Sequence, residues 1–183
     1  PGGLGSYDIW MSEREGTGWS KPVNLGATIN TPWLEQSPFI HPDQQSLYFS
    51  STGWPGMGQG DLFRSELGPD TAQLPPRNLG YPINTFNDEI GLSINARGDK
   101  AYFASDREGA GDTDLYSFEL PQEFRPVPVS YLTGRVYDSG TMRGIQALIQ
   151  LIDLNTEEVV MELESHPGEG AYLISLPMDR DYA

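Results

Sequence analysis

Residues 24–31 read Asn-Leu-Gly-Ala-Thr-Ile-Asn-Thr, and residues 78–85 read Asn-Leu-Gly-Tyr-Pro-Ile-Asn-Thr, so the same pattern returns after 54 positions. The same spacing relates Glu35 to Glu89 and Ser51 to Ser105. Further along, Asp61-Leu62-Phe63 matches Asp114-Leu115-Tyr116 at a spacing of 53, and Asp8-Ile9-Trp10 lies another 53 residues upstream of Asp61. The first part of the chain is therefore an internal repeat of about 53 residues.

Each copy of the repeat reads as a series of short strands separated by turns. Aromatic and aliphatic runs favour strands, and Gly, Pro, Asn and Asp clusters favour the turns between them. Four strands in a unit of 40 to 55 residues are typical of a β-propeller blade. The expected strands are 37–40, 46–51, 61–65 and a fourth near 77–79 in one copy, and 91–95, 100–105 and 114–119 in the next.

Within these strands the sequence resembles the PD40 repeats of TolB-type β-propellers. The resemblance covers roughly residues 5–120 and rests on Phe39-Ile40-His41-Pro42-Asp43, Leu47-Tyr48-Phe49-Ser50-Ser51, 101–107 and Asp114-Leu115-Tyr116. The departures are His41 and Gln44, where the family has serine and glycine, and the turn 96–99. The resemblance implies that residues 1–125 are the C-terminal blades of such a propeller.

The pattern changes after Leu120. Three prolines between 121 and 128 indicate an extended linker or edge strand. Strands are then expected at 133–138, 147–152, 158–164 and 171–177. Within 158–164, the apolar residues 159, 161 and 163 alternate with residues that point to the opposite face. Residues 132–138, 155–158, 170–177 and 181–182 resemble the carboxypeptidase-regulatory-like, transthyretin-like β-sandwich. We therefore expect an all-β chain whose residues 126–183 form an incomplete sandwich, and which is a fragment of a larger protein.

Composition excludes several classes of protein. The formal net charge is −15 with only 11 Lys and Arg, which argues against nucleic acid and anionic membranes. Cysteine is absent, so there is no disulfide framework or thiol nucleophile. No apolar run approaches the roughly 20 residues that cross a bilayer. We predict neither a membrane span nor a cofactor.

Acidic stretches recur where each copy enters its first strand, and the candidate binding residues in them are Glu35, Gln36, Asp88 and Glu89. In a propeller this strand lines the central channel, so these side chains would lie near one mouth of it and could hold a ligand. The alternative is that Glu35 and Glu89 cap turns of the repeat itself.

The glycine-rich stretch 53–60 contains two residues that could anchor a partner, Trp54 and Met57. A phosphate-binding loop would have to begin a helix, whereas a strand is expected here, so we interpret the stretch as a hairpin connection. For both side chains, packing against the neighbouring repeat is the alternative role.

Asp106, Asp112 and Asp114 flank a second glycine loop and are candidates for a calcium site. Because Asp114 has repeat mates in Asp8 and Asp61, binding of turn N–H groups is the competing role. His41 falls at a turn of the repeat, and no nucleophile elbow or zinc-protease motif is present. We predict no metal and no catalytic residue.

The order of propeller and regulatory-like sandwich resembles large periplasmic OmpA-family proteins of Bacteroidota, of the PorE-like type associated with type IX secretion. That resemblance implies a periplasmic, outer-membrane-associated scaffold that binds envelope or secretion-complex proteins, and peptidoglycan indirectly through another domain. Two alternatives are an accessory region of a peptidase and a carbohydrate-binding module that uses Trp10, Trp19, Trp33 and Trp54.

Overall fold

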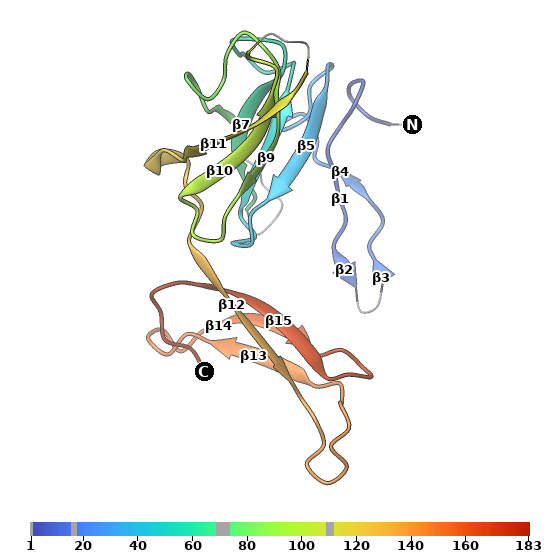
Figure 1. Ribbon diagram of the computed structural model, residues 1–183. Helices are drawn as coiled ribbons and strands as arrows, with labels where there is room; N and C mark the ends of the chain where they lie inside the picture. Colours follow the sequence, from blue (N-terminus) through green and yellow to red (C-terminus); the bar gives the residue numbers. More distant parts are fainter. Residues whose placement is uncertain (1, 16–17, 69–73, 109–111) are drawn as a thin grey trace. The chain divides into compact units, whose positions relative to one another are not determined.

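The computed structural model describes residues 2–15, 18–68, 74–108 and 112–183 (Figure 1). It is all-β, with a single 3-10 turn among the described residues. The chain divides into two compact units, residues 1–126 and 127–183. Within the described ranges, no helix has the length and apolar character needed to cross a bilayer.

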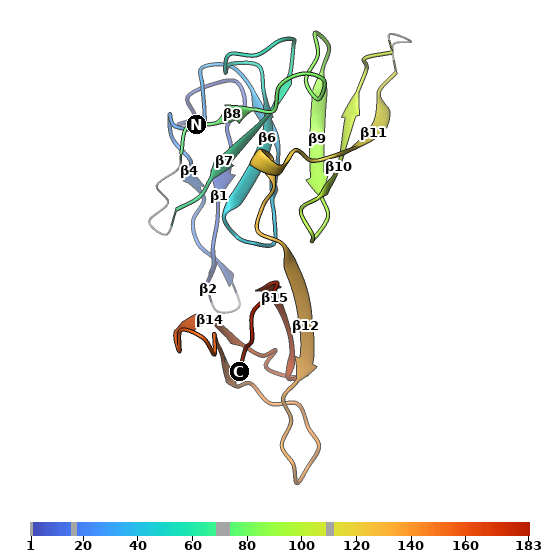
Figure 2. The ribbon, with the colours of Figure 1, turned by 90° about the vertical axis from the view of Figure 1, so that its left-hand side faces the viewer.

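Two antiparallel sheets, one from each full copy of the repeat, dominate the first unit (Figure 2). The first sheet has the order β5-β6-β7-β8, with strands β5 Glu35–Ile40, β6 Ser46–Ser51, β7 Asp61–Glu66 and β8 Arg77–Asn78. The second has the order β11-β10-β9, with strands β9 Glu89–Ile94, β10 Lys100–Ser105 and β11 Asp114–Glu119. Strands β6, β10 and β11 have the bounds expected from the sequence, and β5 and β9 each begin two residues earlier.

The segment before the first sheet supplies two short hairpins. Strand β1 (Trp10–Met11) pairs with β4 (Val23–Asn24), and β2 (Arg14–Glu15) pairs with β3 (Gly18–Trp19). The pair Trp10–Asn24 corresponds by the repeat spacing to the pair Phe63–Asn78 between β7 and β8. Strands β1 and β4 are therefore the last two strands of a further copy.

Both faces of the first sheet carry apolar side chains, which explains why every residue of β6 is buried. Alternate residues of a strand point to opposite faces. Tyr48 and Leu62 lie on one face, in a cluster shared with the second sheet. Phe49 and Phe63 lie on the other, with ring centroids 6.0 Å apart, in a cluster shared with β1 and the 25–29 segment. The repeats are thus held together by layers of side chains between successive sheets.

Strands β5 and β9, the first strands of the two sheets, each contain a bulge with a left-handed backbone conformation. The register shifts between Gln36 and Phe39 in β5, and opposite Tyr102 and Ala104 in β9. Ser37 has φ 51° and its repeat mate Gly91 has φ 67°. A serine at this position adopts a conformation that glycine adopts more readily.

Residues 121–128 differ from the expectation of a fully extended linker or edge strand. A 3-10 turn, Gln122–Phe124, follows Pro121 and buries Phe124. The Phe124 carbonyl accepts a hydrogen bond from the Tyr48 hydroxyl at 2.6 Å. Burial raises the pKa of Tyr48 to about 12. The turn forms because its aromatic side chain and carbonyl complete the core of the first unit.

The second unit consists of two antiparallel pairs, β12 (Val129–Arg135) with β15 (Ala171–Pro177), and β13 (Leu148–Ile152) with β14 (Val159–Glu164). Its buried apolar side chains are Val129, Leu151 and Ile174. Gly134 faces Tyr172 across the first pair, and a Cβ at Gly134 would collide with the Tyr172 ring. The glycine therefore leaves the space that the ring fills.

Candidate functional site

Glu35, predicted at a channel mouth, is buried at the start of β5 and bound by the turn before it. Its carboxylate accepts hydrogen bonds from the Thr31 N–H and the Thr31 hydroxyl, both at 2.7 Å. The Ser51 hydroxyl, from the end of β6, donates to the same carboxylate at 2.7 Å. Three donors from the protein thus replace the water that a buried carboxylate loses.

Glu89 repeats this arrangement in the second sheet. Its carboxylate accepts from the Thr85 N–H at 2.8 Å, the Thr85 hydroxyl at 2.6 Å and the Ser105 hydroxyl at 2.9 Å. A fourth donor is added here, because Arg107 places a guanidinium nitrogen 3.2 Å from the carboxylate. We call each set, Thr31–Glu35–Ser51 and Thr85–Glu89–Ser105, a carboxylate node.

Trp54 and Arg107 have the same role in successive repeats. The Trp54 indole N–H donates to the Ile29 carbonyl at 2.8 Å, and Arg107 donates to the Ile83 carbonyl at 2.6 Å. Ile29 and Ile83 are repeat mates. Trp54 is half-buried and packs against the cluster between β1 and the first sheet. These contacts favour the packing role over the partner-anchoring role for Trp54.

The contacts of the carboxylate nodes also favour the structural alternative for Glu35 and Glu89, which are 2% and 0% exposed. Gln36 is half-buried beside Glu35. Asp88 is half-buried, and its carboxylate accepts the Gly60 N–H at 2.7 Å. Glu35, Asp88 and Glu89 therefore support the fold at the end of the unit where β5 and β9 begin.

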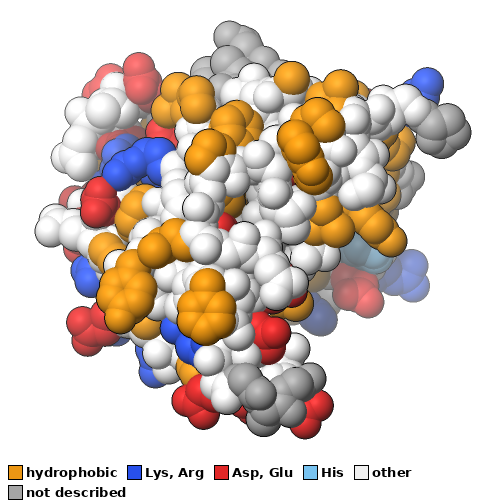
Figure 3. Space-filling view, turned by 90° about the horizontal axis from the view of Figure 1, so that it is seen from above, with side chains coloured by type: hydrophobic (Ala, Val, Ile, Leu, Met, Phe, Trp, Pro, Cys, Tyr) orange, Lys and Arg blue, Asp and Glu red, His pale blue; other side chains and the backbone are white. Residues whose placement is uncertain are grey.

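Exposed apolar side chains gather at this same end, beside the nodes. The turn that follows each Thr of a node carries a large side chain, Trp33 in one repeat and Phe86 in the next. Leu4 and Met57, which are repeat mates, lie in the facing loops. Each of these four side chains is at least half exposed, and we call them the apolar rim. Figure 3 shows hydrophobic side chains in several groups on the upper face of the molecule.

Backbone contacts between the loops place the members of the apolar rim. The Ser6 N–H donates to the Trp33 carbonyl at 2.7 Å, and its repeat mate Gln59 donates to the Asn87 carbonyl at 3.3 Å. A Cβ at Gly58 would collide with the backbone of residues 85–87, and one at Gly5 with that of residues 31–33. Glycine at these two positions lets one loop lie directly on the turn of the following repeat.

Of the apolar rim, the sequence predicted Met57 as a partner anchor and Trp33 only within the carbohydrate-binding alternative, and it did not point to Leu4 or Phe86. A usable signal lay next to the recognised repeat: the match Ile-Asn-Thr ends at Thr31 and Thr85, and the following residues diverge to Pro32-Trp33 and Phe86-Asn87.

The predicted calcium candidates do not come together around a common point. The Asp106 carboxylate accepts the Asp88 N–H at 3.0 Å, so it is engaged by a turn. Asp112 and Asp114 are exposed. Across residues 2–15, 18–68, 74–108 and 112–183, no group of three acidic or histidine side chains has the arrangement of a metal site.

His41 lies at the turn after β5, which is the position that the repeat register predicts, and its side chain is fully buried. Its Nε2 lies 3.1 Å from the Asn95 carbonyl, and its Nδ1 accepts the Asp43 N–H at 3.2 Å. Asn95 is the repeat mate of His41, so this contact joins equivalent turns of successive sheets. Both ring nitrogens are engaged by the fold.

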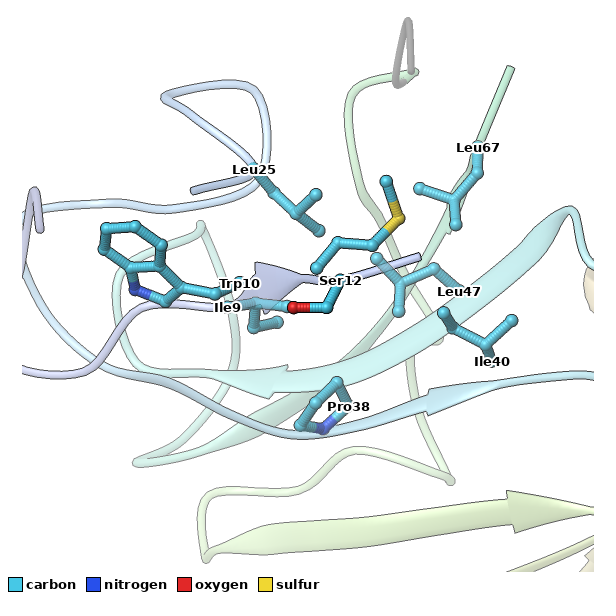
Figure 4. Close-up of a pocket in the computed structure, with 9 residues that line it drawn as sticks. Ile9, Trp10, Ser12, Leu25, Pro38, Ile40, Leu47 and Leu67 are labelled. Carbon is cyan, nitrogen blue, oxygen red and sulfur yellow. The ribbon is translucent and has the colours of Figure 1, made fainter. Parts of the chain in front are cut away.

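A groove of about 320 Å³ lies between β1 and the first sheet (Figure 4). Apart from Ser12 and the Trp10 indole N–H, its side chains are apolar, so it suits an aliphatic group better than a sugar or an ion. The lining residues are Ile9, Trp10, Met11, Ser12, Leu25, Pro38, Ile40, Leu47 and Leu67.

Comparison with known proteins finds no family model that matches this chain and no characterised protein that is significantly similar to it.

Proposed function

We propose that this chain is a non-enzymatic protein-interaction scaffold, with propeller-type blades in its first unit and a regulatory-like β-sandwich in its second. Support for the blades comes from the contacts, since a carboxylate node, a bulge and an interlocking turn recur at the same repeat positions. Each sheet packs on the next through a shared apolar layer, as stacked repeats do.

The apolar rim is the observation that carries the binding function. Its four side chains lie in the turns and loops where successive repeats meet, and they make none of the hydrogen bonds that hold those loops. Exposed aromatic and Met side chains on a rigid support are characteristic of protein interfaces. Glu35 and Glu89, buried beside the rim, keep its turns in one conformation, which reduces the ordering cost of binding.

A non-enzymatic role is supported by how the buried polar groups are used. Glu35, Glu89 and His41 are each engaged by neighbouring turns and strands rather than directed into a cavity. The apolar lining of the groove beside β1 offers no acid–base pair. An accessory role beside a peptidase domain agrees with the same observations.

For the setting, the proposal is the periplasm, in association with the outer membrane. It rests on the order of PD40-like repeats followed by a regulatory-like sandwich, which resembles the order in PorE-like envelope proteins. The partners are then envelope or secretion-complex proteins, and peptidoglycan is reached through another domain. A surface with net charge −15 favours a partner with basic or neutral polar residues around an apolar centre.

The test is a comparison of three immobilised baits against a bacterial envelope extract. These are the natural chain, the rim variant Met57→Asp/Phe86→Asp, and the matched control Val23→Asp/Leu154→Asp, which adds the same two charges at exposed aliphatic side chains outside the rim. We expect mass spectrometry to identify the same envelope protein on the first and third baits, and a large loss on the second. Equal recovery on all three, or peptide cleavage by the chain, would contradict the proposal.

Carbohydrate binding is the second candidate, because Trp19 and Trp33 are 72% and 59% exposed and could stack on sugar rings. Fluorescence titration with envelope polysaccharides separates the two functions. Quenching that is lost in Trp33→Ala and Trp19→Ala variants would favour the carbohydrate function over the scaffold.

A further inference from the structure

Two segments of the first unit hold the outer edge of a strand in the same way. They are residues 24–31 and 78–85, which share the pattern Asn-Leu-Gly-x-x-Ile-Asn-Thr and are called here the outer-edge segments. In the second, the Asn84 side chain accepts the Leu62 N–H at 2.8 Å and donates to the Leu62 carbonyl at 2.9 Å. The Leu79 N–H also donates to that carbonyl, at 3.0 Å.

The first outer-edge segment binds Ile9, the repeat mate of Leu62, through the same three hydrogen bonds. Asn30 accepts the Ile9 N–H at 2.8 Å and donates to the Ile9 carbonyl at 3.0 Å, while the Leu25 N–H donates to that carbonyl at 3.1 Å. This recurrence shows that the contact belongs to the pattern and not to one local environment.

Each outer-edge segment also covers the side chain whose backbone it holds. Leu79 and Ile83 lie in the same buried cluster as Leu62, which is 0% exposed. Leu25 and Ile29 lie in the same cluster as Ile9. Each segment therefore hydrogen-bonds the backbone of one residue and packs against the apolar side chain of the same residue.

The third copy of that strand, β11, lacks this cover among the described residues. Leu115 opposes Ala104 in the register of β10 and β11, as Leu62 opposes Ser50 in that of β6 and β7. Leu115 is 75% exposed, and β11 lies at the edge of its sheet. The Leu62 N–H and carbonyl point away from β6, toward Asn84. Because Leu115 has the equivalent position in the ladder of β10 and β11, its N–H and carbonyl point away from β10, toward the open edge.

We propose that the open edge of β11 is a binding site for an extended polypeptide segment of the pattern Asn-Leu-Gly-x-x-Ile-Asn-Thr. The second Asn of the pattern binds the Leu115 N–H and carbonyl, and its Leu and Ile cover the Leu115 side chain. Tyr102, the exposed mate of buried Tyr48, lies beside Leu115 on the same face and widens the apolar contact. This site is inferred from the repeat contacts alone and does not depend on the proposed envelope role.

The test uses the full chain, labelled with ¹⁵N, and a synthetic peptide with the sequence of residues 22–33, Pro-Val-Asn-Leu-Gly-Ala-Thr-Ile-Asn-Thr-Pro-Trp. Saturable shifts of the amide signals of residues 114–118 are expected. A peptide with Asn30→Ala should bind at least about tenfold more weakly, equivalent to roughly 1.4 kcal/mol. A Thr28→Ala peptide is the matched control, because position 28 varies between the copies, and it should bind like the parent.

Two protein variants complete the design. Leu115→Glu should abolish binding while leaving amide signals distant from β11 in place, and Leu154→Glu, which changes an exposed leucine of the second unit, should not affect it. No shift in β11 at millimolar peptide, or equal affinity for the Asn30→Ala peptide, would overturn the proposal. Shifts confined to β1 or β7 would indicate exchange with the chain's own segments, and concentration-dependent shifts of β11 without peptide would indicate a second copy as the occupant. Either result would also contradict it.

Discussion

Asn84 binds both backbone polar groups of Leu62, 22 residues earlier in the chain, with hydrogen bonds of 2.8 and 2.9 Å. Both residues are buried, so neither water nor a flexible side chain replaces these bonds. Strand β7 of the first sheet is thereby fixed to the turn that precedes β9 of the second sheet, and the unfolding of the two sheets should be coupled.

The variant Asn84→Ala should destabilise the first unit by about 2 to 3 kcal/mol, because it leaves the buried Leu62 N–H without an acceptor. Urea unfolding followed by tryptophan fluorescence measures this unit selectively, since the four tryptophans lie at positions 10, 19, 33 and 54. Asn155→Ala, in an exposed turn of the second unit, is the control and should leave the fluorescence transition unchanged. A change below about 0.5 kcal/mol for Asn84→Ala would show that the bonds add little.

Arg107 and Glu89 form an ion pair, and their contributions to stability should be energetically coupled because the Glu89 carboxylate is fully buried. Arg107→Met should cost about 2 kcal/mol, less than the 3 to 5 typical of a broken buried pair, since the carboxylate of Glu35 persists with hydroxyl and N–H donors alone. A double-mutant cycle with Glu89→Gln should give a coupling free energy of about 1 to 2 kcal/mol. Additive effects in urea unfolding would disprove the coupling.

Gln44→Gly should stabilise the first unit by about 0.5 to 1 kcal/mol. Gln44 has φ 61°, and Gly98 occupies the same turn position in the next repeat with φ 73°. The strain relieved in the left-handed region exceeds the entropy that an added glycine costs. Gln45→Gly, at the neighbouring position outside the left-handed region, should instead destabilise. Thermal unfolding of the two variants distinguishes them, and a lower Tm for Gln44→Gly would refute the argument.

Stability of the first unit should fall in acid through Asp43. Burial alone would raise the pKa of this carboxyl, but the nearby His41 ring and the N–H groups of Ser46 and Gln45 lower it overall. The stabilisation is therefore complete above the unfolded-state pKa of about 4 and is lost as the pH falls through the folded pKa. Asp43→Asn should lose about 1 to 3 kcal/mol at pH 7.

The check is the pH dependence of the unfolding free energy between pH 7 and pH 2. The difference between the natural chain and Asp43→Asn should shrink as the pH falls below about 4, with a part of it remaining at pH 2 because the folded-state pKa is far below the unfolded one. Glu13→Gln, which changes an exposed carboxyl, should show little difference throughout. A difference that stays constant with pH would mean that the charge of Asp43 has no part in the stabilisation.

Much of the fold was accessible from the sequence because each repeat carries its own local signals. The turn residues and aromatic runs of 46–51, 100–105 and 114–119 predict the bounds of β6, β10 and β11, since strand propensity and turn chemistry are properties of neighbouring residues. The 3-10 turn at Gln122–Phe124 was missed, because it forms to place Phe124 beside Tyr48, 76 residues away.

At the site, the recurrence of residues can be read from the sequence, but the direction in which their side chains point depends on contacts that form only in the folded chain. The recurrence of Glu35 and Glu89 would look the same in the sequence if they bound a ligand. In the folded chain their carboxylates instead accept hydrogen bonds from Ser51 and Ser105, on strands that meet them only after folding. Leu62 and Leu115 are likewise equivalent in sequence, yet one is buried and the other 75% exposed. The physical reason is that burial depends on which segment lies against a strand, and that neighbour is encoded elsewhere in the chain.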